Sequence, residues 1–182
     1  LGGMLRHVLL SGLLLPSAAL LSAPLSAPLA LLPFRTRVTC PNCGPRVRIV
    51  SVGKTKEAWL QQALAEYTKR LRMVQLEYTW VRDDTALIAE AKGPCIVLDE
   101  RGKLCSSAEF SELLFAAIEE GGSRLSFIIG AADGLPAELR NGGHPLLSLG
   151  RMTLTHQMAR LLLAEQIYRA CEIRRGSKYH RE

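Results

Sequence analysis

Short apolar segments alternate with amphipathic ones from Arg46 to Arg174, and this alternation constrains the fold more than any other feature of the chain. The apolar segments predict strands at 46–52, 74–80, 94–99, 124–129 and 146–149. The segments between them predict helices over 57–72, 85–92, 106–120, a short stretch after Pro136, and 156–174. Strands that alternate with helices in this way favour an α/β fold, in which a mostly parallel sheet lies between helices.

Residue patterns within the segments support these assignments. The segment Pro94–Asp99 is continuously apolar, as expected for a strand covered on both faces. Ser106 and Glu109 have the spacing of a capping box, which predicts the start of the helix that runs to Glu120. The segment 57–72 carries its apolar residues at helical spacing, which indicates core positions rather than a ligand-binding set: Trp59, Leu60, Ala63, Leu64, Tyr67 and Leu71.

The ends of three predicted strands are candidate ligand-binding loops. Open α/β sheets bind ligands beyond the carboxyl ends of their strands, which here means the residues after Leu98, Ile129 and Leu149. In the second loop, Gly130 and Gly134 would let the backbone approach a ligand closely, although two glycines also suit a plain turn. The sequence has neither the glycine-rich dinucleotide motif after the first strand nor a P-loop motif, which argues against those two kinds of site.

Charge is distributed unevenly along the chain, whose formal net charge is +6. Residues 57–139 hold 8 basic and 14 acidic side chains, whereas residues 140–182 hold 8 basic and 3 acidic ones. The tail concentrates its cations beside an aromatic and an imidazole side chain, a mixture suited to phosphate contact and base stacking: Arg174, Arg175, Lys178 and Arg181. We therefore expect RNA affinity to come from this C-terminal face and to fall with salt, with a solvated terminus as the alternative.

The first 45 residues differ in composition from the rest of the chain. Residues 8–32 are apolar, rich in Ala, Ser and Pro, and free of acidic side chains. This composition predicts a targeting segment over 1–45, for a plastid more than a mitochondrion, ahead of a single domain over 46–182. A secretory or bipartite signal stays open as an alternative. A membrane-spanning helix is disfavoured because three prolines interrupt the apolar run: Pro16, Pro24 and Pro28.

The five cysteines are an odd number at irregular spacing, so they predict no disulfide framework and favour a reducing compartment: Cys40, Cys43, Cys95, Cys105 and Cys171. The first two have metal-ligand spacing, but no second Cys or His pair follows at zinc-finger distance. We therefore predict no metal site. A zinc or thiol-redox protein that depends on these two cysteines is kept as an alternative function.

Several motifs occur in an order that is specific to one group of enzymes. They are VRIVSVGK at 47–54, LDERGK at 98–103, FIIG at 127–130, SLGRMTLTHQM at 148–158, AEQIYRA at 164–170 and the closing YHRE. Over residues 46–182 the chain thereby resembles the RlmH-type ribosomal RNA large subunit methyltransferases, a minimal SPOUT group. The resemblance implies a SPOUT α/β-knot, which is a Rossmann-like parallel sheet with a C-terminal deep trefoil knot.

The same resemblance implies the activity, the cofactor and the partners. It implies a homodimer that methylates N3 of a pseudouridine in a stem-loop of large-subunit ribosomal RNA within the assembled ribosome, with S-adenosylmethionine as methyl donor and no membrane partner. The residues it implies for donor binding fall on the three candidate loops: Leu98, Gly130, Leu149, Gly150, Arg151, Met152, Thr153 and Leu154. The chain departs from the family pattern at Ala131, where a glycine is usual, and at Thr155, where a proline is usual. The segment 81–91 is also shorter than in relatives.

Methylation of an imide nitrogen requires the loss of a proton, so a base or a cation that stabilises the anion would assist the reaction. The candidate catalytic residues are His156, Arg160, Tyr179 and His180. The first two lie four residues apart at the start of the last predicted helix, on one face of it. In a dimer, the C-terminal tail could complete the partner's site. A ribosome-binding module that keeps the basic tail without binding the donor is the alternative of a different class.

Overall fold

The structure is a computed structural model that describes residues 44–179 of the chain. The predicted targeting segment over 1–45 lies outside the described residues, except for its last two positions. Cys40, Cys43, His180 and Arg181 also lie outside them. Within the described range, no helix is both long and apolar enough to cross a membrane.

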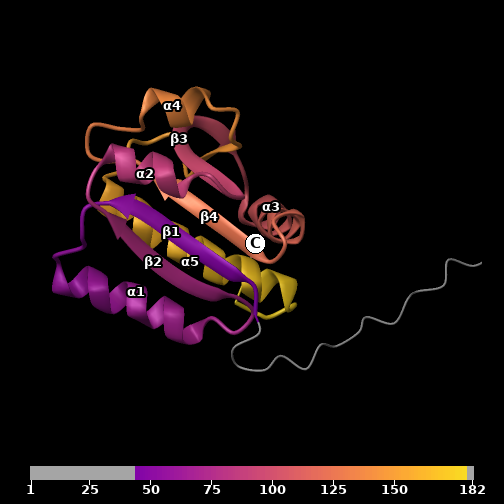
Figure 1. Cartoon of the computed structure of the whole chain (residues 1–182). Coiled ribbons are helices and arrows are strands. Elements are labelled where there is room, and N and C mark those ends of the chain that lie inside the picture. The colour runs from indigo at the N-terminus through magenta and orange to yellow at the C-terminus, as the bar shows by residue number, and fades with distance from the viewer. Residues whose placement is uncertain (1–43, 180–182) are drawn as a thin grey trace, which may run out of the picture. The chain divides into compact units, whose positions relative to one another are not determined.

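Five strands and five helices alternate along the described residues (Figure 1). The strands are β1 (Arg46–Val52), β2 (Gln75–Val81), β3 (Cys95–Leu104), β4 (Arg124–Ile129) and β5 (Leu146–Ser148). The helices are α1 (Ala58–Arg70), α2 (Asp84–Glu90), α3 (Ser107–Glu120), α4 (Ala137–Asn141) and α5 (His156–Arg174). The strands form one sheet in the order β2-β1-β4-β3-β5, and every neighbouring pair is parallel. This confirms the predicted α/β class, while the trefoil knot stays a prediction.

The predicted loop after Leu98 is wrong, because β3 continues to Leu104. Strand β5 pairs with β3 twice: Leu98 faces Leu147 and, after a register shift, so does Lys103. The intervening residues bulge out of the ladder, and such bulges bend a strand and redirect its side chains. Gly102 fits this close approach, since a Cβ on it would lie 2.6 Å from the backbone nitrogen of Leu147.

One face of the sheet is covered by α1, α3 and α5. Apolar side chains of these helices pack on the inward-facing residues of the strands, with Phe110 of α3 against Phe127 of β4 at a centroid separation of 6.0 Å. Leu60, Leu163 and Ile167 are fully buried in this cluster. The periodicity in α1 and α5 therefore reflects core packing, as predicted for α1. The prediction is wrong for Trp59, whose side chain is 55% exposed because it lies in the first turn of α1 on the side away from the sheet's core.

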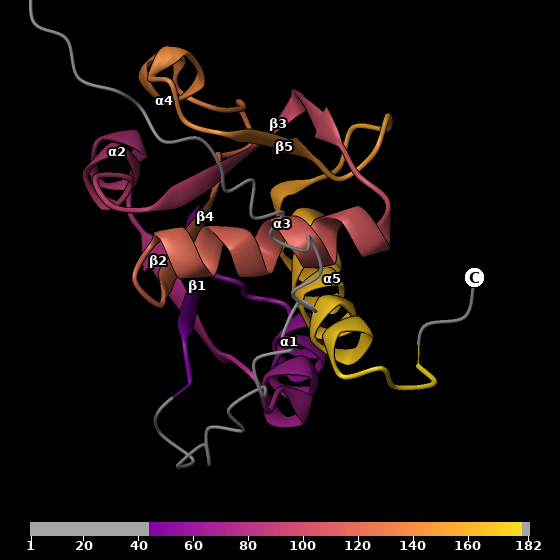
Figure 2. The same ribbon diagram turned by 90° about the vertical axis from the view of Figure 1, so that its right-hand side faces the viewer.

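The opposite face is covered by α2 and α4, which lie together in Figure 2 and apart from α1. Leu87 of α2 is fully buried and Leu139 of α4 nearly so, over Val50, Val97 and Ile128 of the sheet. Asp83 caps α2 by accepting a hydrogen bond from the Ala86 backbone N–H at 2.9 Å. The segment 81–91, although short, thus contains a capped helix that packs on the sheet. With α2 and α4 in place, both faces of the sheet are covered.

Candidate functional site

A cavity of about 300 Å³ lies at the carboxyl edge of the sheet, where the bulge of β3 and the ends of β4 and β5 meet the start of α5. This volume is at the lower end of the range that small-molecule sites occupy. The walls come from three segments that are remote in sequence: residues 98–100 within β3, residues 129–135 at the end of β4 and beyond it, and residues of the stretch 147–154 at the end of β5 and beyond it. His156 and Ala159 of α5 complete the lining.

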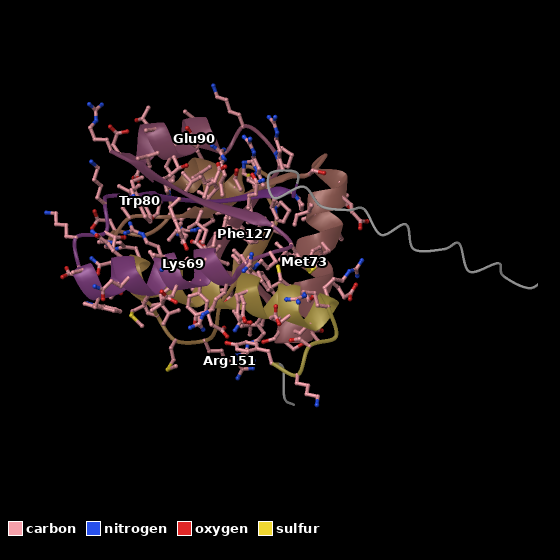
Figure 3. The ribbon with its side chains drawn as sticks, turned by 90° about the horizontal axis from the view of Figure 1, so that it is seen from below. Lys69, Met73, Trp80, Glu90, Phe127 and Arg151 are labelled. Carbon is pink, nitrogen blue, oxygen red and sulfur yellow. The ribbon has the colours of Figure 1, made fainter. Side chains whose placement is uncertain are left out.

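The structure brings most of the residues implied for donor binding into this one cavity. Seven of the eight line it: Leu98, Gly130, Leu149, Gly150, Met152, Thr153 and Leu154. The eighth, Arg151, is exposed, lies outside the lining, and projects at the margin of the molecule in Figure 3. The loops were selected because parallel strands end at one edge, and the same geometry explains why they meet here.

Gly130 allows the turn after β4 to close tightly at the cavity wall. The residue is buried, and a Cβ on it would clash with the carbonyl oxygen of Gly134 and lie 3.0 Å from the Cα of Leu135. The turn is also held by a hydrogen bond from the Gly134 N–H to the Ala131 carbonyl oxygen at 3.1 Å. Ala131 itself lines the cavity, so its methyl group is accommodated in the wall.

The connection from β5 to α5 is shaped by two hydroxyl groups. The Ser148 hydroxyl donates to the Gly150 carbonyl oxygen at 2.8 Å, which folds the start of the connection back on the strand. The Thr155 hydroxyl accepts a hydrogen bond from the Met158 N–H at 3.3 Å and so caps α5. Thr155 therefore supplies a capping acceptor at the position where the resemblance suggests proline.

Asp99 and Arg140 are cavity residues that sequence reasoning missed. The Asp99 side chain is 3% exposed and accepts from the Arg140 guanidinium at 2.9 Å and from the Arg101 backbone N–H at 2.8 Å. Burial raises the pKa of Asp99, but these two hydrogen bonds and the positive charges of Arg140 and Arg101 together outweigh it and hold the pKa below its ordinary value. Arg140 comes from α4, and its proximity to a residue 41 positions earlier in the chain has no local sequence signal.

His156 is the titratable side chain that α5 presents to the cavity. Its pKa is lowered from 6.5, mainly because burial disfavours the imidazolium and also because the Arg160 charge repels it. The imidazole is therefore neutral at pH 7 and can accept a proton.

Arg160 does not line the cavity, so the structure does not support its predicted contact with substrate. It is fully buried, and its guanidinium donates hydrogen bonds to the Ser51 and Thr55 hydroxyls and to the carbonyl oxygens of Val52 and Gly53. His156 and Arg160 are four residues apart and so lie on the same side of α5. His156 points to the cavity, however, whereas Arg160 points to the end of β1. Arg160 is therefore a structural residue in this arrangement.

Tyr179 also lies away from the cavity within its own protomer. Its hydroxyl is 3.4 Å from Glu165 Oε1, and its ring packs edge-on against Tyr168 at 4.9 Å. Glu165 is nine residues beyond His156, which corresponds to about 13 Å along the helix axis. His156 and Tyr179 are thus not brought together in a single protomer.

Three of the four predicted RNA-binding cations, Arg174, Arg175 and Lys178, lie at the far end of α5 from the cavity, roughly 27 Å by the rise of an α-helix. Arg175 pairs with Glu172 at 2.8 Å, and Arg174 pairs with Glu112 at 3.8 Å and covers the ring of Phe115. Lys178 is exposed and has no ion pair among the described residues. These cations can therefore bind RNA at the cavity only if a second copy of the chain supplies them.

A second cavity of about 480 Å³ lies between α1 and the edge strand β2, lined by residues that include Leu64, Ala65, Tyr78 and Trp80. It has neither a close-packed glycine turn nor a convergent set of loop backbones. The cavity at the carboxyl edge has both and contains His156 and the Asp99–Arg140 pair. The carboxyl-edge cavity is therefore the candidate active site.

The chain is similar in sequence to known proteins over most of its described residues. The family model described as "Predicted SPOUT methyltransferase" matches residues 46–180. The chain is 46% identical over 139 residues to the ribosomal RNA large subunit methyltransferase H of Protochlamydia amoebophila, covering 75% of this chain and 99% of that protein. It is 43% identical over 148 residues to the protein of the same name from Prochlorococcus marinus, covering 77% and 94%. It is 38% identical over 138 residues to that of Thermus thermophilus, covering 75% and 98%.

Proposed function

Because the chain belongs to the SPOUT methyltransferases and, within them, to the family of ribosomal RNA large subunit methyltransferase H, we propose that it methylates N3 of a pseudouridine in large-subunit ribosomal RNA. S-Adenosylmethionine is the methyl donor. The observation that carries the proposal is the convergence of seven implied donor-binding residues on one cavity at the carboxyl edge of the sheet.

The composition of the cavity fits the donor. When bound, S-adenosylmethionine supplies an electrophilic methyl group on a positively charged sulfonium. The lining contains three carboxylates, from Asp99, Glu100 and Asp133, and one guanidinium, from Arg140. A predominantly acidic wall with a single cation suits a ligand that carries a sulfonium, an ammonium and one carboxylate. The tight turn at Gly130 brings backbone donors and acceptors to the wall, where an adenine or a ribose can bind them.

His156 is the residue best placed to hold the proton of the substrate. The imide N3–H of a pseudouridine is weakly acidic, and the nitrogen must lose this proton to attack a methyl group in line. A neutral imidazole at the cavity wall can accept it, and the lowered pKa of His156 keeps the imidazole in that form at pH 7. The remaining candidates, Tyr179 and His180, would act on the cavity of a second copy.

A homodimer is part of the proposal and has support in exposed apolar side chains. Met152, which lines the cavity, is 80% exposed, Met158 in the first turn of α5 44%, and Trp59 in the first turn of α1 55%. Large apolar side chains gathered on one surface mark interaction sites, and most soluble assemblies are symmetric dimers. A second copy would also bring a basic tail to the cavity, which α5 keeps distant within one protomer.

The test is a titration of S-adenosylmethionine into the purified chain by calorimetry, followed by methyl transfer to large ribosomal subunits that lack the modification. We expect one donor site per protomer and the product N3-methylpseudouridine, detected by mass spectrometry of digested RNA. Donor binding without transfer to any RNA position would contradict the proposed substrate. A folded dimer that binds ribosomes but no donor would favour the non-catalytic ribosome-binding alternative.

The organelle in which this ribosome lies depends on the targeting segment over 1–45, which the structure does not describe beyond its last two residues. A plastid address, ahead of a mitochondrial one, stays a prediction. Import of the full chain into isolated organelles would test it directly.

A further inference from the structure

Arg160 is a buried cation without an anionic partner among residues 44–179. Buried arginines usually pair with carboxylates, because removing a charge from water is costly. Here the guanidinium is satisfied by neutral groups. Its donors lie 3.1 Å from the Ser51 hydroxyl, 3.0 Å from the Thr55 hydroxyl and 2.8 Å from the Gly53 carbonyl oxygen, and the ring of Trp80 covers it at 4.6 Å.

These contacts fix the connection between β1 and α1, which spans 53–57. Arg160 holds its first residue, Gly53, whose φ of +74° turns the chain away from the strand. Arg160 also holds the Thr55 hydroxyl, while the Gln61 side-chain amide donates to the Thr55 carbonyl oxygen at 2.7 Å. Thr55 is therefore tied inward from two sides and is 7% exposed.

The two lysines that flank Thr55 are exposed as a result. Lys54 and Lys56 form no ion pair with any residue that the structure describes, including the neighbouring Glu57. Since the buried guanidinium beneath them also lacks a carboxylate partner, its charge adds to theirs rather than cancelling it. The connection thus presents a small surface of positive charge, held in one conformation.

This surface lies at the edge of the sheet that holds the candidate active site. All strands are parallel and β1 is next to β4, so the residues after β1 neighbour the turn at Gly130. Arg160 is one helical turn beyond His156, so the first turn of α5 borders both the cavity and the connection. Figure 1 shows the connection leaving β1 toward the start of α1. Arg174, Arg175 and Lys178, in contrast, lie at the opposite end of α5 in the same protomer.

We propose that Lys54 and Lys56 bind phosphate groups of the RNA next to the target nucleotide, and that Arg160 is the positioning residue that holds them there. The ligand is the phosphate backbone, so these lysines supply affinity and register rather than base specificity. The inference rests on the proposed function, because it names the contact through which that same site holds its RNA.

The experiment measures binding of the purified protein to large ribosomal subunits that lack the modification, at several salt concentrations. The test variant is the double substitution Lys54→Gln and Lys56→Gln. The matched control is Lys69→Gln with Arg70→Gln, which removes two cations from the last turn of α1, where both pair with Glu66. Donor affinity of each variant is measured by calorimetry.

We expect the test variant to bind RNA more weakly and to flatten the salt dependence by about 1 logarithmic unit of slope per lysine, with unchanged donor affinity. The control should keep the slope of the unmodified protein. Equal slopes for all three proteins, while the unmodified protein methylates the RNA, would overturn the inference and leave the proposed function standing. Absence of methylation by the unmodified protein would overturn both.

Arg160 is tested through a variant that leaves its own charge in place. Thr55→Val removes the hydroxyl that Arg160 holds, with little change of shape. We expect it to weaken RNA binding, and to add nothing when combined with Lys54→Gln and Lys56→Gln, because it acts through those side chains. Additive losses in the combined variant would show that the connection has a role apart from its lysines and would overturn the positioning role of Arg160.

Discussion

His156 is the side chain on which the proposed chemistry depends most directly. Substitution of His156 by Ala should lower the methyl transfer rate by about 10²–10⁴-fold, which is the usual contribution of a general base, while donor binding persists. The matched control is His144→Ala, since His144 lies at the opposite edge of the sheet, 3.3 Å from Cys95 Sγ. An unchanged single-turnover rate in the His156 variant would exclude it as the base.

The pH dependence of the rate follows from the lowered pKa of His156. A base must be unprotonated, so the rate should be constant near pH 7 and fall as the pH drops through a value below 6.5. Burial is the main cause of the lowered pKa, and the Arg160 charge is the second. Substitution of Arg160 by Met should therefore shift the acid limb of the profile to higher pH. A limb that does not move would show that the Arg160 charge has no influence on the base.

Gly130 offers a second test at the scale of single residues. An added methyl group would clash with the Gly134 carbonyl oxygen, so Gly130→Ala should cost about 1–3 kcal/mol of stability and weaken donor binding. Gly93→Ala is the matched control, because a Cβ there has nothing within 4 Å. Urea unfolding and calorimetry would measure both effects, and equal donor affinities for the two variants would argue against a donor site at this turn.

Some residues of the cavity could be predicted from the sequence and others could not. The glycine and loop positions of the cavity were predictable because strand order and parallel geometry bring them to one edge. The Asp99–Arg140 pair was not, because it joins residues 41 positions apart through an ion pair that leaves no periodic pattern. The spacing of His156 and Arg160 correctly placed both near the start of α5, but it could not tell that Arg160 turns to the β1 connection.

At the scale of elements, the start of α5 links helix stability to activity. The Thr155 hydroxyl accepts a hydrogen bond from the Met158 N–H, so Thr155→Ala should lower the free energy of unfolding by about 1 kcal/mol. It should also lower the methyl transfer rate, because His156 lies in the turn that would fray. Ser106→Ala removes an equivalent cap from α3, no residue of which lines the cavity, and should cost similar stability without affecting the rate. Equal rates for both variants would contradict the link.

The boundaries of the elements were largely predictable, because caps and periodicity are local signals. The capping box at Ser106 and the full extent of α5 are present as predicted. The continuation of β3 to Leu104 was missed, because residues 99–104 are mostly polar and resemble a loop. Pairing with β5, rather than local propensity, makes this segment a strand.

At the scale of the whole molecule, dimerisation should make stability and activity depend on protein concentration. If two copies share an interface at Trp59 and Met158, the melting temperature should rise with concentration. Met158→Glu should give a monomer in sedimentation experiments and abolish methyl transfer, with Leu104→Glu as the control at another exposed apolar side chain. An active Met158→Glu monomer would contradict a site completed by two protomers.

The position of β1 inside the sheet has a consequence for synthesis on the ribosome. Arg46 of β1 pairs with Arg124 of β4, which follows it by 78 residues. Until β4 has been synthesised, β2 is the only strand that can pair with β1. Parallel pairing at this sequence distance slows folding, and an unpaired apolar strand edge invites association with other chains. A chain of this topology should therefore depend on chaperones during a long, incompletely folded interval.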